Sequence, residues 1–410
     1  MKLYLGYIIN PCATSGVEYY PDGALVVSTE KRIIYSGDAS KAFESFPAAQ
    51  IIDCDGKVIL PGFVDLHSHI PQLPIVGTAR GTLLEWLEDY VFPVETEFSN
   101  PELARSIARQ FFEEAHRRGT RTMALYSSSN LQSTEIAFEE AERIGMRAYI
   151  GLCLMDMNAP AALLKSAEEN IRDLLLISNA WHGKDNGRLQ SIVTPRFALS
   201  CSPELLKKSG EIAASEGLFI QTHLSENLNE IDAVKSLYPD SPDYTSVYRQ
   251  FGLLTDKTLL AHTIHLSEAE RDAIRTSGAI AVHCPLSNKY LRSGIMPLAD
   301  MLSGDIRLSL GSDVAAGHSL SMLSVAREAV ESSKMLDFSN GNPNEKLVDV
   351  ETAFRLATIE GAKALGIESE TGNLDAGKKA DFIIVDCPRL SIDLPATGED
   401  VLASVMYRDL

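Results

Sequence analysis

Positive charge is scarce in this sequence. Its 410 residues include 37 lysines and arginines against 56 aspartates and glutamates, which gives a formal net charge of −19. Binding to nucleic acid or to an anionic membrane surface requires a basic protein surface. The charge balance therefore argues against both kinds of partner.

Long apolar runs and paired cysteines are also missing. No run of about 18 or more apolar residues occurs, so we expect no membrane-spanning helix, and residues 1–16 have one lysine and no apolar core, so we expect no signal peptide. Six cysteines are scattered along the chain, at Cys12, Cys54, Cys153, Cys201, Cys284 and Cys387. None forms a CxxC pair, and buried, reduced thiols in a cytoplasmic protein are the simplest interpretation.

The two ends of the chain share one pattern. Hydrophobic residues make up 45% and charged residues 23%, which is typical of a soluble globular protein. Residues 1–60 predict short strands with no convincing helix period, and "GNLDAGKKADFIIVD" near the C-terminus again predicts a turn and a strand. We therefore expect one small β domain, a β-sandwich built from residues 1–60 and 372–410, beside a central domain over residues 61–371.

The central domain alternates strand and helix signals, which indicates parallel βα units. Helices are bounded by caps, as in residues 100–119, where Asn100 precedes Pro101 and Gly119 ends the pattern. Eight strands are predicted, over residues 58–66 (continuing to the histidines that follow), 120–128, 146–155, 189–198, 218–224, 258–264, 279–285 and 307–313. Eight such units in one run predict a (β/α)8 barrel. A doubly wound open sheet is the alternative, and it requires a reversal of strand order that the sequence does not reveal.

Metal-type side chains end several of these strands. His67 and His69 end the first, His223 the fifth, His262 the sixth and Asp313 the eighth. Active sites of such barrels lie at the carboxyl ends of the strands, so these five side chains should converge. Residues two apart on a strand point to the same side, which allows one strand end to offer two imidazoles to one ion.

Histidines and a carboxylate around an open position form the donor set of a catalytic zinc site, which lowers the pKa of bound water to about 7. Glu226 follows His223 by three residues and is a candidate proton shuttle. Each feature also has an ordinary explanation, since a lone HxH is weak evidence and Asp313 could cap a helix. The joint pattern favours the metal site. His283 ends the seventh strand, where it either supports the site or packs in the core.

The sequence resembles the amidohydrolase superfamily in "PGFVDLHSH", "QTHLSE", "LLAHTIH", "AVHCPLSN" and "LGSD". The fourth strand ends without the lysine common in two-metal members, which indicates a one-metal member. The segments "LLEWLEDYVFPVE", "TPRFALSCS" and "LGSDVAAGHSLSMLSVAREAV" are more specific, and they resemble the guanine deaminase family. Members of that family usually continue with further strands after the last one found here, so we expect the C-terminal part of the small domain to be truncated or reduced.

The resemblance implies roles for individual residues. The metal ligands would be His67, His69, His223 and Asp313, with His262 near the metal-bound water as a further ligand in some descriptions. Glu226, Asp313 and His262 would be the catalytic groups. The substrate pocket would be lined by Gln72, Arg196, Phe197, Leu84 and Trp86. A glutamine amide and an arginine suit the lactam edge of guanine, and a phenylalanine suits its flat ring.

The resemblance implies hydrolytic deamination of guanine to xanthine and ammonia by a homodimer, which we expect to be cytoplasmic and to carry one Zn²⁺ per chain, with Fe²⁺ as the alternative ion. In this mechanism, Glu226 moves a proton from the activated water to a ring nitrogen and Asp313 relays one to the leaving amine. Two other classes stay open. One is a related amidohydrolase acting on 8-oxoguanine, a pterin, a cytosine-like ring or a triazine, and the other is a non-catalytic scaffold of the same fold.

Overall fold

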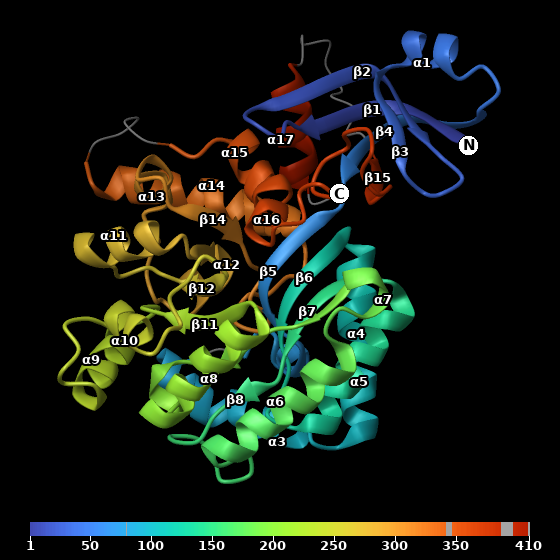
Figure 1. The fold of residues 1–410 in the computed structure, drawn as a ribbon. Helices are drawn as coiled ribbons and strands as arrows, with labels where there is room; N and C mark the ends of the chain where they lie inside the picture. The colour runs from blue at the N-terminus through green and yellow to red at the C-terminus, as the bar shows by residue number, and fades with distance from the viewer. Residues whose placement is uncertain (79, 342–346, 387–396, 409–410) are drawn as a thin grey trace.

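The computed structural model describes residues 1–78, 80–341, 347–386 and 397–408, and Figure 1 shows the arrangement. A five-stranded sheet at one end has the order β15-β4-β1-β2-β3. Its strands are β1 (Lys2–Pro11), β2 (Val17–Val27), β3 (Ile33–Asp38), β4 (Gln50–Pro61) and β15 (Phe382–Asp386). β15 pairs antiparallel with β4, so both ends of the chain contribute to this sheet, as predicted.

The rest of the chain forms a barrel of parallel strands. Two four-stranded sheets, in the orders β5-β6-β7-β9 and β11-β12-β13-β14, make up its wall. The strands are β5 (Phe63–His69), β6 (Thr120–Tyr126), β7 (Arg147–Gly151), β9 (Leu189–Ser191), β11 (Ile220–Leu224), β12 (Thr258–His262), β13 (Ile280–His283) and β14 (Arg307–Leu310). The short strands β8 (Cys153–Leu154) and β10 (Thr194–Pro195) pair with each other and extend the third and fourth positions.

Backbone hydrogen bonds close the wall at both joints between the two sheets. On one side, the N–H of Val193 donates to the carbonyl of Phe219 at 2.9 Å and the N–H of Gln221 donates to the carbonyl of Val193 at 2.9 Å. On the other side, the N–H of Asp313 donates to the carbonyl of His67 at 2.8 Å, and the N–H of His69 donates to the carbonyl of Val314 at 3.2 Å. The barrel is therefore closed, and the open-sheet alternative is wrong.

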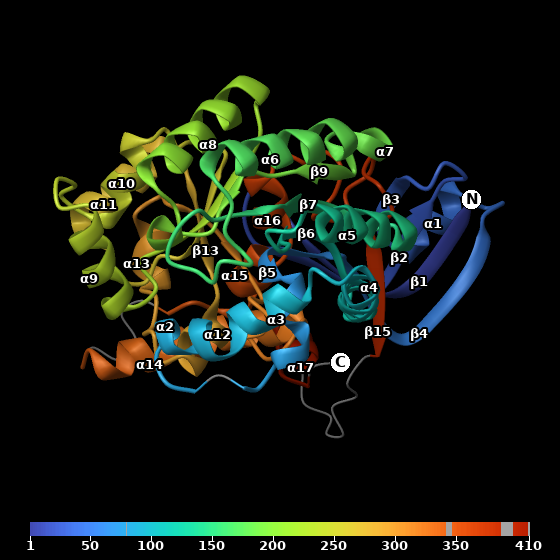
Figure 2. The ribbon, with the colours of Figure 1, turned by 90° about the horizontal axis from the view of Figure 1, so that it is seen from below.

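Helices surround the barrel (Figure 2). The longer ones are α4 (Pro101–Arg117), α5 (Leu131–Ile144), α6 (Ala167–Trp181), α8 (Pro203–Glu216), α9 (Leu228–Leu237), α11 (Glu268–Ser277) and α14 (Met322–Ser339). Their caps follow the sequence signals: the side chain of Asn100 accepts from the N–H groups of Glu102 and Leu103, and Gly217 ends α8 in the left-handed conformation. α4 buries Ile107 and Phe111 against the core.

Shorter helical segments connect these elements and build the mouth of the barrel. They are η1 (Ile70–Ile75), α2 (Leu83–Trp86), η2 (Leu87–Val91), α3 (Phe92–Glu97), α7 (Lys184–Gly187), η3 (Ala198–Ser200), α10 (Tyr244–Gln250), α12 (Pro285–Tyr290), α13 (Leu298–Ser303), α15 (Val350–Leu356) and α16 (Ile359–Ala364). α2 and α3 follow β5 closely in sequence, and Figure 2 shows them beside α12 on one face of the barrel.

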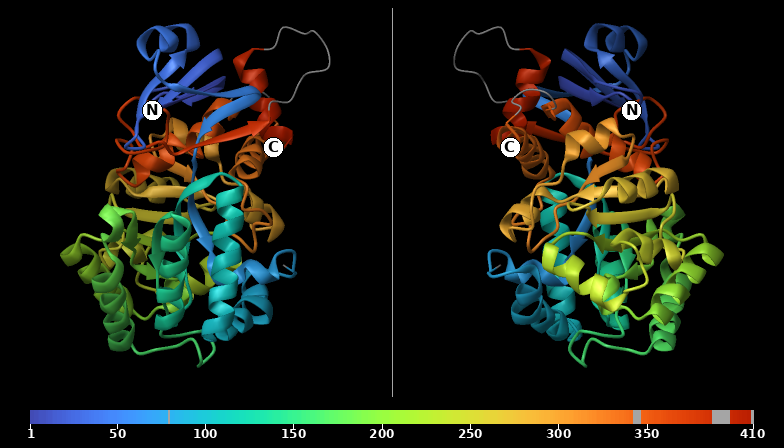
Figure 3. Two further views of the ribbon diagram at one scale, coloured as in Figure 1. Left: turned by 90° about the vertical axis from the view of Figure 1, so that its right-hand side faces the viewer. Right: turned by 90° about the vertical axis from the view of Figure 1, so that its left-hand side faces the viewer.

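The ends of the chain also contain helices that the sequence did not indicate. α1 (Ala39–Ser45) interrupts the strands of residues 1–60 and buries Ala42 against the small sheet. α17 (Gly398–Arg408) buries Leu402, Val405 and Met406 and packs against α14 and α15 beside the barrel, and both views of Figure 3 place it there. Residues 387–396 and 409–410 of the predicted C-terminal segment lie outside the described residues, so the domain boundaries stay a prediction.

No helix among the described residues is long and apolar enough to cross a membrane.

Candidate active site

The paired histidines of the first barrel strand meet at its carboxyl end. β5 is buried along its whole length, and the side chains of His67 and His69 are 1% and 3% exposed. Their Nε2 atoms lie 3.3 Å apart. The alternation of a strand therefore brings both imidazoles to one point, as the sequence predicted.

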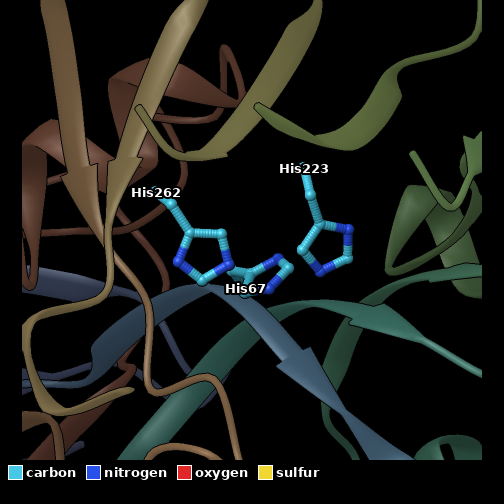
Figure 4. A group of neighbouring side chains, drawn as sticks. All are labelled: His67, His223 and His262. Carbon is cyan, nitrogen blue, oxygen red and sulfur yellow. The ribbon is translucent and has the colours of Figure 1, made fainter. Parts of the chain in front are cut away.

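Three more predicted residues reach the same point from other strands. The Nε2 atom of His223 lies 3.2 Å from that of His69, and Oδ1 of Asp313 lies 3.2 Å from Nε2 of His67 and 3.4 Å from Nε2 of His69. His67, His223 and His262 each offer a ligand atom within 4.8 Å of the other two. Figure 4 shows these three side chains pointing toward one another from different strands.

Hydrogen bonds behind the rings fix which nitrogen faces the cluster. Nδ1 of His223 lies 2.7 Å from the carbonyl oxygen of Arg196, and Nδ1 of His262 lies 2.9 Å from Oδ1 of Asn288. Both partners are acceptors, so each Nδ1 carries the proton and each Nε2 presents a lone pair to the cluster. Lone pairs that converge at such distances need a cation between them, and this donor set fits a metal cofactor.

The pKa shifts of His69 and Asp313 also suit a metal ion at this point. Burial lowers the pKa of His69 to about 4, against the opposing effect of Asp313. Burial would raise the pKa of Asp313, but the imidazoles outweigh it and hold that pKa well below its usual value. Neutral imidazoles and an ionised carboxylate are the forms that bind metal ions.

The backbone is strained at two of these positions. His262 has φ of 73° and Asp313 has φ of 48°, in the left-handed region that residues other than glycine seldom adopt. Such conformations persist where the surroundings enforce them, and they gather at functional sites.

Glu226 lies beside this cluster without joining it. Its Oε2 lies 3.4 Å from Nε2 of His262, and its Oε1 accepts a hydrogen bond of 2.9 Å from the hydroxyl of Ser293. Burial, with the charge of Asp313 as a second cause, raises the pKa of Glu226 to about 8. A carboxyl group with this pKa can hold or release a proton near neutral pH.

A pocket opens at the cluster. It is lined by His69, Gln72, Leu83, Trp86, Leu87, Arg196, Phe197, His223, Glu226, Glu230, His262, Leu291, Asp313 and Ala316. Four of the five predicted substrate contacts are therefore here. Leu84 lines the adjoining surface groove with Leu87 and Phe92. Leu84 and Trp86 are two residues apart on α2, and that spacing directs their side chains to different faces of the helix.

The profile of the amidohydrolase family matches residues 58–407. The guanine deaminase of Mus musculus is 36% identical over 397 residues, which cover 95% of this chain and 87% of the mouse protein. The chain belongs to the amidohydrolase family, with the guanine deaminases. The guanine deaminase of Escherichia coli (strain K12) is 35% identical over 374 residues, which cover 91% of this chain and 83% of that protein.

Two solved structures share the fold of this chain. The guanine deaminase of C. acetobutylicum with guanine bound in its active site has a TM-score of 0.92 and 32% identity, and the match covers 99% of this chain and 95% of that one. Atrazine chlorohydrolase from Arthrobacter aurescens has a TM-score of 0.86 at 19% identity, which shows the shared fold alone.

Two buried polar residues of this amidohydrolase, Glu95 and Glu230, lie at or behind the pocket wall and were not predicted from its sequence. Glu95 is 1% exposed, accepts a hydrogen bond of 3.1 Å from Nε2 of Gln72, and forms an ion pair of 2.6 Å with Arg196. It is the last residue of "LLEWLEDYVFPVE", and no spacing rule links it to Arg196, from which it is separated by 101 positions in the sequence. Glu230 had a local signal, because the capping box with Asn227 at the start of α9 follows the N-x-x-E pattern.

His283 is also buried at the end of its strand, at 1% exposure, and burial lowers its pKa to about 3. Its Nδ1 atom has no hydrogen-bond partner among the described residues, and it does not line the pocket. Its supporting role stays a prediction.

Proposed function

We propose that this amidohydrolase is a zinc-dependent guanine deaminase, which hydrolyses guanine to xanthine and ammonia. The observation that carries the proposal is one buried point where His67, His69, His223 and Asp313 meet, beside a pocket lined by Gln72 and Arg196. The sequence and structural likeness to guanine deaminases supports the choice of substrate.

The metal ligands are His67, His69, His223 and Asp313, with His262 as a fifth donor. Three imidazoles and a carboxylate are a donor set that Zn²⁺ favours, and Fe²⁺ is the alternative. When bound, the ion supplies an acidified water as the nucleophile and neutralises charge that develops during the reaction.

Glu226 moves the proton that the reaction requires. Its carboxylate takes a proton as water adds to C2 of guanine, and its carboxylic acid then gives that proton to the ring nitrogen beside C2. The hydroxyl of Ser293 holds one carboxyl oxygen, and the other stays beside Nε2 of His262. Asp313 relays the second proton of the water to the exocyclic nitrogen. Breaking the C2–N bond then releases ammonia, and xanthine retains the oxygen.

The far wall of the pocket binds the purine. Arg196 and Gln72 offer N–H donors, which suit the acceptor atoms of guanine. Phe197 is 6% exposed and lines the pocket, where it can pack on the flat ring. Trp86, at 3% exposure, covers another side of the pocket, and Leu84 lies outside this lining. A contact between Leu84 and the substrate therefore stays a prediction.

Replacing Arg196 by alanine is expected to raise the KM for guanine about 100-fold, because a lost hydrogen bond from a charged donor costs about 1.5–3 kcal/mol. The change also leaves Glu95 as a buried charge without its partner, so the melting temperature should fall. Steady-state kinetics and thermal unfolding measure the two effects. Arg172→Ala, at an exposed arginine, is the control. An unchanged KM would remove Arg196 from the substrate pocket.

Ammonia release from guanine by the purified protein tests the proposal directly. The panel should include 8-oxoguanine, pterin, cytosine and a chlorotriazine, and product chromatography should identify xanthine. Release from guanine at the highest kcat/KM supports the proposal. Faster release from another compound would support a deaminase with that compound as its substrate. No release from any of them by metal-loaded, folded protein would reject the proposed activity.

The proposal includes a cytoplasmic homodimer. The described cysteines are all free thiols, which suits a reducing compartment. Light scattering of the purified protein measures the oligomeric state.

A further inference from the structure

Glu95 lies behind the pocket wall and contacts both of the residues that face the substrate. It belongs to α3, and its two carboxylate oxygens are divided between two partners. Oε1 accepts from Nε2 of Gln72 at 3.1 Å, and Oε2 accepts from Nη1 of Arg196 at 2.6 Å. All three side chains are at most 3% exposed, so water cannot replace these contacts cheaply.

These contacts determine which way the Gln72 amide points. Nε2 donates to Glu95, and Oε1 accepts from the backbone N–H of Ala315 at 3.4 Å. The flipped amide would place its oxygen against a carboxylate oxygen and its NH₂ group against an N–H group. Both contacts would then be repulsive, so only one orientation is satisfied. In that orientation the second hydrogen of Nε2 is free to donate to a ligand.

The same carboxylate orients Arg196 and balances its charge. One nitrogen of the guanidinium is engaged by Glu95, and the planar group keeps further N–H donors in fixed directions. The pocket is lined by Arg196 and Gln72 while Glu95 stays behind them. The edge of the pocket formed by Gln72 and Arg196 therefore presents only hydrogen-bond donors, and Glu95 balances the positive charge of Arg196.

We propose that Glu95 is a positioning residue that keeps this edge donor-only, so that the pocket selects 2-aminopurines with a carbonyl at C6 and rejects those with an amino group there. The inference rests on the proposed deamination at C2. Guanine offers an acceptor at C6, whereas 2,6-diaminopurine offers a donor at the same position and 2-aminopurine offers neither. A buried donor that faces another donor loses its hydrogen bond, and sites built on such bonds discriminate strongly.

The wild-type protein provides the first test, in which guanine, 2-aminopurine and 2,6-diaminopurine are compared by ammonia release. We expect kcat/KM for guanine to exceed that for 2,6-diaminopurine by about 1,000-fold or more, since polar sites reach 10⁴–10⁵. Release from guanine with a ratio below about 10 would overturn the inference and leave the proposed function standing. No release from any of the three would instead reject the proposed function.

Glu95→Gln is the second test. The glutamine can accept from Arg196 with its oxygen, but its NH₂ group then faces the NH₂ group of Gln72. Flipping Gln72 would relieve this contact, turn an acceptor toward the pocket and leave the Gln72 NH₂ group against the N–H of Ala315, so Gln72 has no fully satisfied orientation in the variant. We expect the KM for guanine to rise at least 10-fold, kcat to stay within about 3-fold because Glu95 touches no reacting atom, and the preference for guanine over 2,6-diaminopurine to fall at least 10-fold.

Glu140→Gln is the matched control, because Glu140 is also 1% exposed and pairs with Arg105, Arg109 and Arg143 far from the pocket. It should lower the melting temperature and leave the substrate ratio unchanged. If Glu95→Gln does not fold, Gln72→Met removes the oriented donor itself and should lower the same ratio. An unchanged ratio in the folded variant would overturn the role of Glu95.

Discussion

Replacing Glu226 by glutamine is expected to lower kcat for guanine by about 1,000-fold while the metal content stays at the wild-type level. The substitution keeps the size of the side chain and its contact with Ser293, but it removes the group that accepts and returns a proton. General acid–base groups contribute about 10²–10⁴-fold to rates, and here one carboxyl serves both steps. Glu226 is not among the grouped metal donors, so the metal should remain.

The measurement combines kcat for guanine with metal analysis of the same sample. Glu140→Gln, which also neutralises a buried glutamate, is the control for a general loss of stability. A kcat within 10-fold of wild type would assign the proton transfer to another residue. Loss of the metal together with the activity would instead make Glu226 a ligand.

Removing the metal is expected to abolish ammonia release and to lower the melting temperature. A ligand present at 1,000 times its Kd stabilises the folded state by about 4.1 kcal/mol, and stripping removes that contribution. The emptied site also leaves Asp313 and the imidazoles around it buried without a cation between them. The effect on activity should therefore be total and the effect on stability large.

The experiment strips the protein with a chelator, measures ammonia release and thermal unfolding, and then adds back Zn²⁺ or Fe²⁺ separately. Return of ammonia release and thermal stability with Zn²⁺ supports Zn²⁺ as the bound ion. Stronger recovery with Fe²⁺ would assign Fe²⁺ to the site instead. His223→Asn should mimic stripping in part, because it removes one donor. Activity that survives complete stripping would contradict the metal-dependent mechanism.

The barrel and the meeting of four histidines and Asp313 at its rim could be predicted from the sequence, because both depend on short-range patterns. Alternation within β5 makes His67 and His69 neighbours, and the βα order places His223, His262 and Asp313 at the same rim. Gln72 follows three residues after His69, and Arg196 and Phe197 are adjacent in the chain, so their placement also follows from one strand end each.

Residues held by long-range packing could not be predicted in this way. Glu95 reaches Arg196 only because the segment from α2 to α3 folds across the barrel mouth, and nothing in the residues around Glu95 specifies that path. Leu84 and Trp86 share one short helix, and only the packing of that helix decides which of them enters the pocket. α17 returns to pack on α14 and α15, a contact that depends on the finished barrel.

The joint between β14 and β5 has a consequence for how the protein is made. Ser312 donates hydrogen bonds to Asp65, 247 residues earlier in the chain, and Asp313 bonds to the backbone of His67 at the same place. The first two histidines are synthesised early, but their carboxylate partner leaves the ribosome only after the other seven strands. Contacts of such high sequence separation form late, since loop closure must come first. The cluster is therefore completed in the same step that seals the barrel, and a chain released before residue 313 would carry its four histidines without the aspartate that completes it.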